Sequence, residues 1–209
     1  AISTVLLEFL KPGDLLLYSL PTYGGTDHFI NHFLKEIGID AIGFRPDHSK
    51  EEIIELIINS GKASKLGMIY IETPANPTNE LIDISMCREI ADHFSTSSKQ
   101  VFVTTDNTYM GPLWSSPIQH GSDLVIYSAT KYIGGQGNSL GGAIIDAGNF
   151  DWSNGKFTEF TEPSAGYHGL KYYETLGAAS FTFKLILEGL RDFGGALSPT
   201  NAFNIIQGL

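Results

Sequence analysis

The sequence contains a single cysteine, Cys87, and few basic residues, so that its formal net charge is −10. One cysteine cannot close an internal disulfide, and this favours a protein of a reducing compartment. The 13 Lys and Arg residues are scattered and form no basic stripe, which argues against a nucleic-acid partner because nothing neutralises the phosphates. We therefore expect a cytoplasmic protein that does not bind nucleic acid.

Long apolar runs and common nucleotide-binding motifs are also missing. The longest apolar runs, such as Val5–Leu10 and Leu15–Leu17, are far too short to span a bilayer, so we expect no membrane partner. There is no phosphate loop of the Gly-Lys-Ser/Thr type. The glycines from Gly134 to Gly142 are loosely spaced and precede a predicted strand, whereas a dinucleotide-binding turn opens a helix.

A metal site is not expected either. The sequence has six histidines, and His28 and His32 have the i,i+4 spacing that puts two ligands on one helix face. No third ligand is evident, and no glutamate is placed as in the metalloprotease helix motif. Cys87 falls in a predicted helix without a partner, so we interpret it as a small buried residue.

What the sequence does contain is an alternation of apolar strands and amphipathic helices over 209 residues, with 42% hydrophobic side chains. Such alternation predicts parallel strands joined by right-handed crossovers, with helices on both faces of the sheet. The fold class is therefore α/β with a mostly parallel sheet. We predict strands at 15–18, 41–44, 66–72, 100–105, 122–127 and 141–146, and helices at 1–10, 27–37, about 50–60, 84–94 and 172–193.

Four of the predicted strands are followed by loops that carry Tyr23, Asn76, Asp106 and Lys131. In a parallel sheet the carboxyl ends of the strands lie on one edge, where ligands of open α/β sheets bind. An aromatic ring, an amide, a carboxylate and a lysine together match what pyridoxal phosphate needs. Lys131 also follows the hydroxyls of Ser128 and Thr130, which can donate to a phosphate.

Taken singly, each of these residues has a plainer interpretation. Tyr23 is more often a packed loop aromatic, Asn76 a turn residue before proline, Asp106 a helix cap and Lys131 a surface cation. Unrelated packing has no reason to put a lysine and a carboxylate on successive strand ends. Their joint placement favours a cofactor site.

Four runs of the sequence resemble the Cys/Met-metabolism family of pyridoxal-phosphate enzymes, which has the aspartate-aminotransferase-like fold (fold type I). These runs are Tyr23–Thr26, Glu72–Pro77, Asp106–Tyr109 and Ser128–Gly135. The resemblance covers the whole chain and implies pyridoxal 5'-phosphate as the cofactor.

The same resemblance implies a role for each site residue. Lys131 would be the Schiff-base lysine and the catalytic proton shuttle, and Asp106 would pair with the pyridinium nitrogen. Tyr23 would stack on the cofactor ring and take part in catalysis, and Asn76 would contact the phenolic oxygen or the substrate. The hydroxyls of Ser128 and Thr130 would hold the phosphate.

Later segments are similar to the O-acetylhomoserine sulfhydrylase branch of that family: 148–157, 160–163, 167–170 and 197–203. Enzymes of this branch convert O-acetylhomoserine and sulfide to homocysteine and acetate, and the family implies a homo-oligomer, a dimer of dimers. Gly25 stands where methionine γ-lyases commonly carry a cysteine, which argues against that activity. Gln136 stands where the family commonly has histidine. Methionine γ-lyase, cystathionine γ-synthase and an inactive cofactor-binding or subunit-packing fragment remain alternatives.

The chain starts and stops inside helical patterns, so we expect a fragment of a longer protein. Residues 1–196 would form the cofactor-binding large domain, incomplete at its N-terminus, and residues 197–209 would begin a C-terminal domain. The family's phosphate-binding Gly-Met pair, the Tyr and Arg from a neighbouring subunit and the carboxylate-binding Arg have no match in this sequence.

Overall fold

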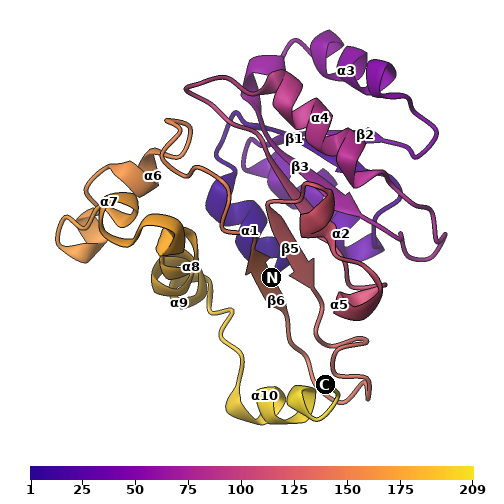
Figure 1. The fold of residues 1–209 in the computed structure, drawn as a ribbon, viewed down its shortest axis with the longest axis vertical. Helices are drawn as coiled ribbons and strands as arrows, with labels where there is room; N and C mark the ends of the chain where they lie inside the picture. Colours follow the sequence, from indigo (N-terminus) through magenta and orange to yellow (C-terminus); the bar gives the residue numbers. More distant parts are fainter.

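The computed structural model describes all residues from 1 to 209, and one six-stranded sheet organises them (Figure 1). The strand order is β2-β1-β3-β4-β5-β6. The strands are β1 (Leu15–Ser19), β2 (Asp40–Phe44), β3 (Leu66–Glu72), β4 (Phe102–Asp106), β5 (Leu124–Tyr127) and β6 (Ala143–Asp146). All six predicted strands are present, with ends shifted by up to two residues.

Strands β1 to β5 pair in parallel, which confirms the predicted mostly parallel α/β sheet. Only β6 runs antiparallel, against β5. The segment 128–142 between them contains no helix that could form a crossover connection. The chain therefore reverses direction after β5, and β6 runs antiparallel beside it. Because β2 and β3 lie on opposite sides of β1, the strand order reverses between β1 and β3.

Helices cover both faces of the sheet, and each face has its own apolar core. Alternate side chains of β1 divide between them: Leu16 and Tyr18 join one core, whereas Leu15 and Leu17 join the other. The first core packs against α1 (Ile2–Phe9), η1 (Phe29–Leu34), α6 (Thr158–Thr161), α7 (Tyr172–Leu176) and α8 (Ser180–Lys184); the second packs against α3 (Lys50–Asn59) and α4 (Ile84–Phe94). None of the helices is long and apolar enough to cross a membrane.

The second core shows how local signals fix helix starts. Ser49 is the cap of α3: its Oγ accepts the backbone N–H of Glu52 at 3.2 Å, and the Glu52 carboxylate accepts the backbone N–H of Ser49 at 2.8 Å. This capping box satisfies donors that the first helical turn leaves free. Helix α4 begins at Ile84 as predicted, after the Asp83 cap, and its Cys87 is fully buried. Burial raises the pKa of the Cys87 thiol.

The helix predicted at 27–37 begins three residues earlier. It consists of α2 (Gly24–His28) and the π-helical turn η1, and it starts directly after Tyr23. Ile30 and Leu34 are buried, but Phe33 is 43% exposed. The predicted apolar face of this helix is therefore narrower than its sequence indicates, and Tyr23 occupies the turn that links β1 to the helix.

Segment 148–169 is not a plain polar connection. Its aromatic residues Trp152, Phe157 and Phe160 are buried around Phe9 of α1, with Trp152 and Phe9 ring centroids 5.3 Å apart. Because these aromatics have irregular spacing, no periodicity in the sequence reveals them as core residues. Here the segment closes one face of the sheet.

The helix predicted over 172–193 is broken. Gly177 has φ +54°, a backbone region that glycine tolerates best, and it ends α7. The chain continues through η5 (Gly177–Ala179), α8, the π-helical turn η6 (Leu185–Leu190) and α9 (Arg191–Phe193). Glycine thus redirects the chain where apolar periodicity alone predicts one continuous helix.

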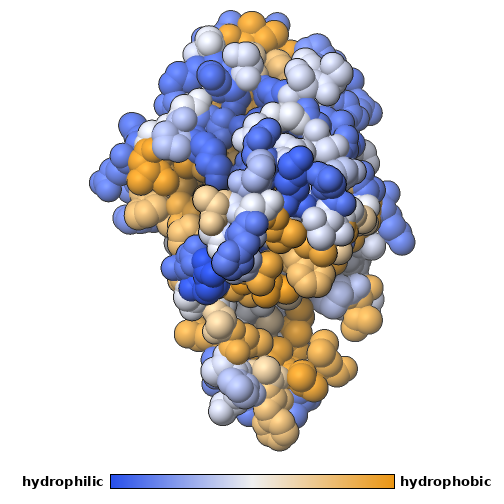
Figure 2. Space-filling view, turned by 90° about the vertical axis from the view of Figure 1, so that its left-hand side faces the viewer, coloured by the Kyte–Doolittle hydropathy of each residue, from blue (hydrophilic) through white to orange (hydrophobic).

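The last helix, α10 (Pro199–Ile206), packs against the glycine-rich turn that follows β5. A Cβ on Gly141 would collide with Cδ1 of Ile205, so the helix and the turn approach each other closely at this glycine. Asn201 donates to the Leu140 carbonyl at 2.9 Å, and Asn204 donates to Ser139 Oγ at 3.1 Å. Figure 2 shows apolar side chains gathered at the lower end of the molecule, the end at which Figure 1 draws α10.

A buried ion network connects the beginning of the chain to its later helices. Lys184 of α8 pairs with Glu8 of α1 and, at 2.6 Å, with Glu188. Glu188 also accepts the Tyr172 hydroxyl at 2.7 Å. Only 4% of the Lys184 side chain is exposed, so each charge depends on its partners to offset desolvation.

We expect Lys184→Met to lower the free energy of unfolding by about 3–5 kcal/mol, because it leaves the Glu8 carboxylate buried without a cation. Urea unfolding followed by circular dichroism measures the change. Lys171→Met is the matched control, since Lys171 pairs with Glu174 at the surface and an exposed pair contributes less than about 1 kcal/mol. Equal losses in the two variants would contradict the assignment of stability to the buried network.

Candidate active site

The carboxyl ends of β1, β3, β4 and β5 surround one cavity of about 670 Å³. All six residues that the sequence singled out line it: Tyr23, Asn76, Asp106, Ser128, Thr130 and Lys131. Asp106 is the last residue of β4, and the other five residues lie in the segments that follow β1, β3 and β5. The four places are more than twenty residues apart in the sequence. Parallel pairing alone brings these loops to the same edge.

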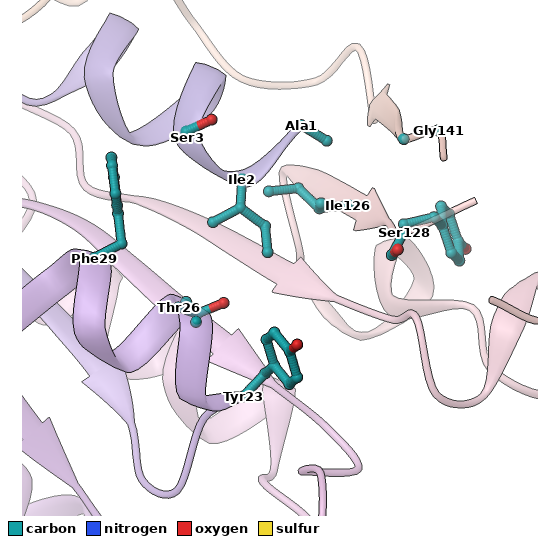
Figure 3. A pocket seen from close by; sticks show the side chains of 12 residues that line it. Ala1, Ile2, Ser3, Tyr23, Thr26, Phe29, Ile126, Ser128 and Gly141 are labelled. Carbon is teal, nitrogen blue, oxygen red and sulfur yellow. The ribbon is translucent and has the colours of Figure 1, made fainter. Parts of the chain in front are cut away.

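A second cavity of about 370 Å³ adjoins the first and shares Ile2, Tyr23 and Ser128 with it (Figure 3). The N-terminal end of α1 borders this cavity through Ala1, Ile2 and Ser3. Figure 3 shows Ile2 between the Tyr23 ring and the end of β5. The first helix therefore forms a wall of the site as well as part of the core.

Asp106 is a buried carboxylate without a cationic partner. It is 5% exposed, and it accepts the Thr108 backbone N–H at 2.9 Å, the Thr108 hydroxyl at 2.5 Å and the Tyr70 hydroxyl at 3.2 Å. Burial raises the pKa of Asp106, and the hydrogen bonds from Thr108 and Tyr70 oppose that rise. No lysine or arginine side chain of the chain pairs with this carboxylate. A cation that entered the cavity would therefore be strongly favoured beside it.

Lys131 lies in the turn after β5. The turn is held by backbone bonds from Lys131 to the Ser128 carbonyl at 3.1 Å and from Gly135 to the Lys131 carbonyl at 2.8 Å. Gly135 has φ +69°, which favours glycine at that position. The Lys131 amine forms no ion pair, so an amine on an ordered turn is available to the cavity.

The two hydroxyls near Lys131 have different surroundings. Thr130 Oγ1 already donates to the Gly141 carbonyl at 3.2 Å and accepts the Gly141 N–H at 3.0 Å. The Ser128 backbone N–H donates to Thr108 at 2.7 Å, and its hydroxyl has no bond within the chain. Ser128 is thus the freer donor of the two, whereas Thr130 would have to exchange its bond to Gly141 to serve a phosphate.

Tyr23 and Asn76 stand on either side of the point where the strand order reverses. Tyr23 follows β1 and is 52% exposed at the cavity, so a face of its ring is open to a ligand. Asn76 follows β3, and its side-chain amide has no partner within the chain, whereas its backbone N–H donates to Glu72 at 3.0 Å. Both side chains are available while their backbones are held.

Three residues of the site were missed by sequence reasoning. Tyr70 and Thr108 hold Asp106, and Thr108 also ties it to the Ser128 loop. Glu72 lies beside Asp106, since these two residues are register partners of β3 and β4. Glu72 and Thr108 do occur in two of the family-like runs, but no signal in the sequence assigns these three side chains to their partners.

The groups that line the cavity fit pyridoxal phosphate. Asp106 lacks a cation that a pyridinium nitrogen would supply, the Lys131 amine is unpaired, and the Tyr23 ring and the Asn76 amide present free contacts. The Ser128 hydroxyl adds a free donor for a phosphate. The ring nitrogen, the aldehyde, the ring face and part of the phosphate of the cofactor thus each find a group of suitable chemistry in this cavity.

The chain was compared with known proteins. The family model for Cys/Met metabolism PLP-dependent enzymes matches residues 1–209. The protein therefore belongs to this family, which confirms both the resemblance and the predicted cofactor class.

Relatives agree with this assignment. A Leptospira meyeri protein named O-acetyl-L-homoserine sulfhydrylase is 38% identical, and the match covers 98% of this chain and 46% of that protein. A Schizosaccharomyces pombe protein named homocysteine synthase is 34% identical, and the match covers 100% of this chain and 47% of that protein. A Campylobacter jejuni structure named as an O-acetylhomoserine (thiol)-lyase, solved with N'-pyridoxyl-lysine-5'-monophosphate, has a TM-score of 0.88 and 32% identity, and it covers 100% of this chain and 49% of that one. The chain spans about half the length of these relatives.

We expect Thr108→Val to lower the free energy of unfolding by about 1–3 kcal/mol, because it leaves the Ser128 N–H without its acceptor and removes a donor from Asp106. Urea unfolding without added cofactor measures this loss. Thr108→Ser keeps the hydroxyl and serves as the control. Equal destabilisation by Thr108→Ser and Thr108→Val would show that the Thr108 hydroxyl does not connect Asp106 to Ser128.

Proposed function

We propose that the full-length protein is a pyridoxal-phosphate enzyme that converts O-acetylhomoserine and sulfide to homocysteine and acetate. The observation that carries the proposal is the convergence of Tyr23, Asn76, Asp106 and Lys131 on one cavity. The Lys131 amine forms no ion pair, and the Asp106 carboxylate has hydrogen-bond donors but no lysine or arginine beside it. The names of the relatives, sulfhydrylase and homocysteine synthase, support this choice of substrates.

In this proposal the Lys131 amine would hold the cofactor, and the Asp106 carboxylate would pair with its ring nitrogen. Tyr23 would bind a face of the ring, Asn76 would contact the phenolic oxygen or the substrate, and the hydroxyls of Ser128 and Thr130 would bind the phosphate. The cofactor supplies an electron sink that stabilises negative charge at the substrate α-carbon. Thr108 and Tyr70 keep the Asp106 carboxylate oriented.

When its amine is free, Lys131 Nζ would be the group that moves protons. It takes the proton from the α-carbon and then assists proton transfer at the β-carbon. Acetate leaves from the γ-carbon, and sulfide adds at the same carbon. Tyr23 borders both adjoining cavities, and this supports the proposal that it contacts the reacting amino acid.

Two other activities use the same first steps. A methionine γ-lyase would release methanethiol from methionine, and a cystathionine γ-synthase would add cysteine in place of sulfide. To discriminate them, the full-length protein is supplied with O-acetylhomoserine plus sulfide, O-acetylhomoserine plus cysteine, or methionine, and the products are separated by mass. Homocysteine from the first mixture supports our proposal, and methanethiol as the sole sulfur product would overturn it.

Lys131→Ala tests the role of the lysine in the full-length protein. We expect homocysteine formation to fall by about 10²–10⁴-fold or more, since the group that moves protons is gone, and the visible absorption band of the bound cofactor to disappear. Lys171→Ala is the control because that lysine lies at the surface, paired with Glu174. Retention of the visible band in Lys131→Ala would show that another amine holds the cofactor.

We also propose the organisation of the whole protein. Residues 1–196 would form most of the cofactor-binding domain, and residues from 197 on would begin a second one. The protein would act in the cytoplasm as a homo-oligomer, a dimer of dimers, so that a neighbouring subunit completes the site. Exposed apolar side chains on α5 (Gly111–Trp114) support association, with Leu113 88% and Trp114 79% exposed.

The 209-residue chain on its own gives a separate test. An inactive fragment would bind the cofactor, with a visible band that depends on Lys131, yet would form no product. Assay of the fragment beside the full-length protein separates binding from turnover. Product formation by the fragment would contradict the proposal that a neighbouring subunit completes the site.

A further inference from the structure

Glu72 connects the two loops that carry Tyr23 and Asn76. One of its carboxylate oxygens, Oε2, accepts the Tyr23 backbone N–H at 2.8 Å, and the other, Oε1, accepts the Asn76 backbone N–H at 3.0 Å. The first bond joins residues 49 positions apart in the sequence. One carboxylate thus uses an oxygen for each loop.

The position of Glu72 is itself well determined. It is the last residue of β3 and is 6% exposed, and its backbone N–H donates to Ser19 Oγ, at the end of β1, at 2.9 Å. The carboxylate therefore sits between neighbouring strands at the place where the strand order reverses. It forms no ion pair and lies beside Asp106, so its two backbone donors are what stabilise its charge.

These bonds act on backbones and leave side chains free. The Tyr23 ring and the Asn76 amide both line the cavity, and Glu72 lines it too. A carboxylate is suited to this task because it only accepts hydrogen bonds, whereas a glutamine amide would turn an N–H toward one of the two donors. A change at Glu72 would thus alter where the ring and the amide lie without removing either.

We propose that Glu72 is a positioning residue that sets the ring of Tyr23 and the amide of Asn76 relative to each other for cofactor binding. The inference rests on the proposed function only in taking these two side chains as cofactor contacts. Small displacements of such contacts weaken binding even when every group is present. Glu72 acts through Tyr23 and Asn76 and does not itself react.

The test is a double-mutant cycle in the full-length protein, with the dissociation constant of pyridoxal phosphate as the readout. We expect Glu72→Gln to weaken cofactor binding by about tenfold in the wild-type background. In a Tyr23→Ala, Asn76→Ala background the same change would weaken binding less than about twofold, because there is no ring or amide left to position. Glu80→Gln is the control: Glu80 lies in the same loop, and its carboxylate contacts only Thr78.

Equal weakening in both backgrounds would overturn the proposal, since Glu72 would then act independently of the two side chains. No weakening in the wild-type background would overturn it too. If Glu72→Gln does not fold, as judged by circular dichroism, Glu72→Asp replaces it, because aspartate keeps the charge and withdraws it by one methylene. The same pattern of non-additivity is expected from aspartate, and additive losses would count against the proposal.

The readout separates this inference from the proposed activity. Cofactor binding needs no amino-acid substrate, so the cycle gives its result whatever the enzyme converts. Non-additive binding in a protein that makes no homocysteine would support Glu72 as a positioning residue and refute the sulfhydrylase proposal. Homocysteine formation together with additive losses of cofactor binding would support the sulfhydrylase proposal and refute Glu72 as a positioning residue.

Discussion

The parallel pairing of β1 with β3, at the point where the strand order reverses, is the constraint on which the rest of this structure depends. Chains leaving these two strands turn to opposite sides, and the space between them is the crevice in which open α/β sheets bind ligands. Tyr23 and Asn76 stand on its two sides, and β4 and β5 add Asp106 and Lys131 along the same edge. The chemistry is therefore distributed over loops that share only an edge of the sheet.

Polar contacts behind this edge are as specific as the groups that face the cavity. One series of hydrogen bonds joins the ends of β4 and β5 through Asp106, Thr108 and Ser128. Another joins the ends of β1 and β3 through Ser19, Glu72 and Tyr23. In each series of hydrogen bonds, one charge or ring stays available to the cavity, whereas the other groups bind neighbouring backbone. Held in this way, a carboxylate without a cation is stable enough to be kept for a ligand.

The sequence was sufficient for the fold class, the strands and the convergence of six cavity residues, because apolar runs mark strands and strand ends mark the ligand edge. It was insufficient where a contact joins distant segments. Nothing local to Glu72 or Tyr70 indicates a partner on another strand, and Trp152 and Phe160 follow no periodicity although both are buried. Gly177 likewise breaks a helix that apolar spacing alone predicts to continue, because its left-handed backbone is a property of one residue.

The contact between α10 and the glycine-rich turn bears on the order in which the protein is built. Ile205 fills the space above Gly141, and Asn201 and Asn204 bind the backbone and side chain of residues 140 and 139. On the ribosome these partners emerge some sixty residues after the turn that carries Lys131. The lysine turn therefore reaches its final contacts only after residues 201–205 have been synthesised.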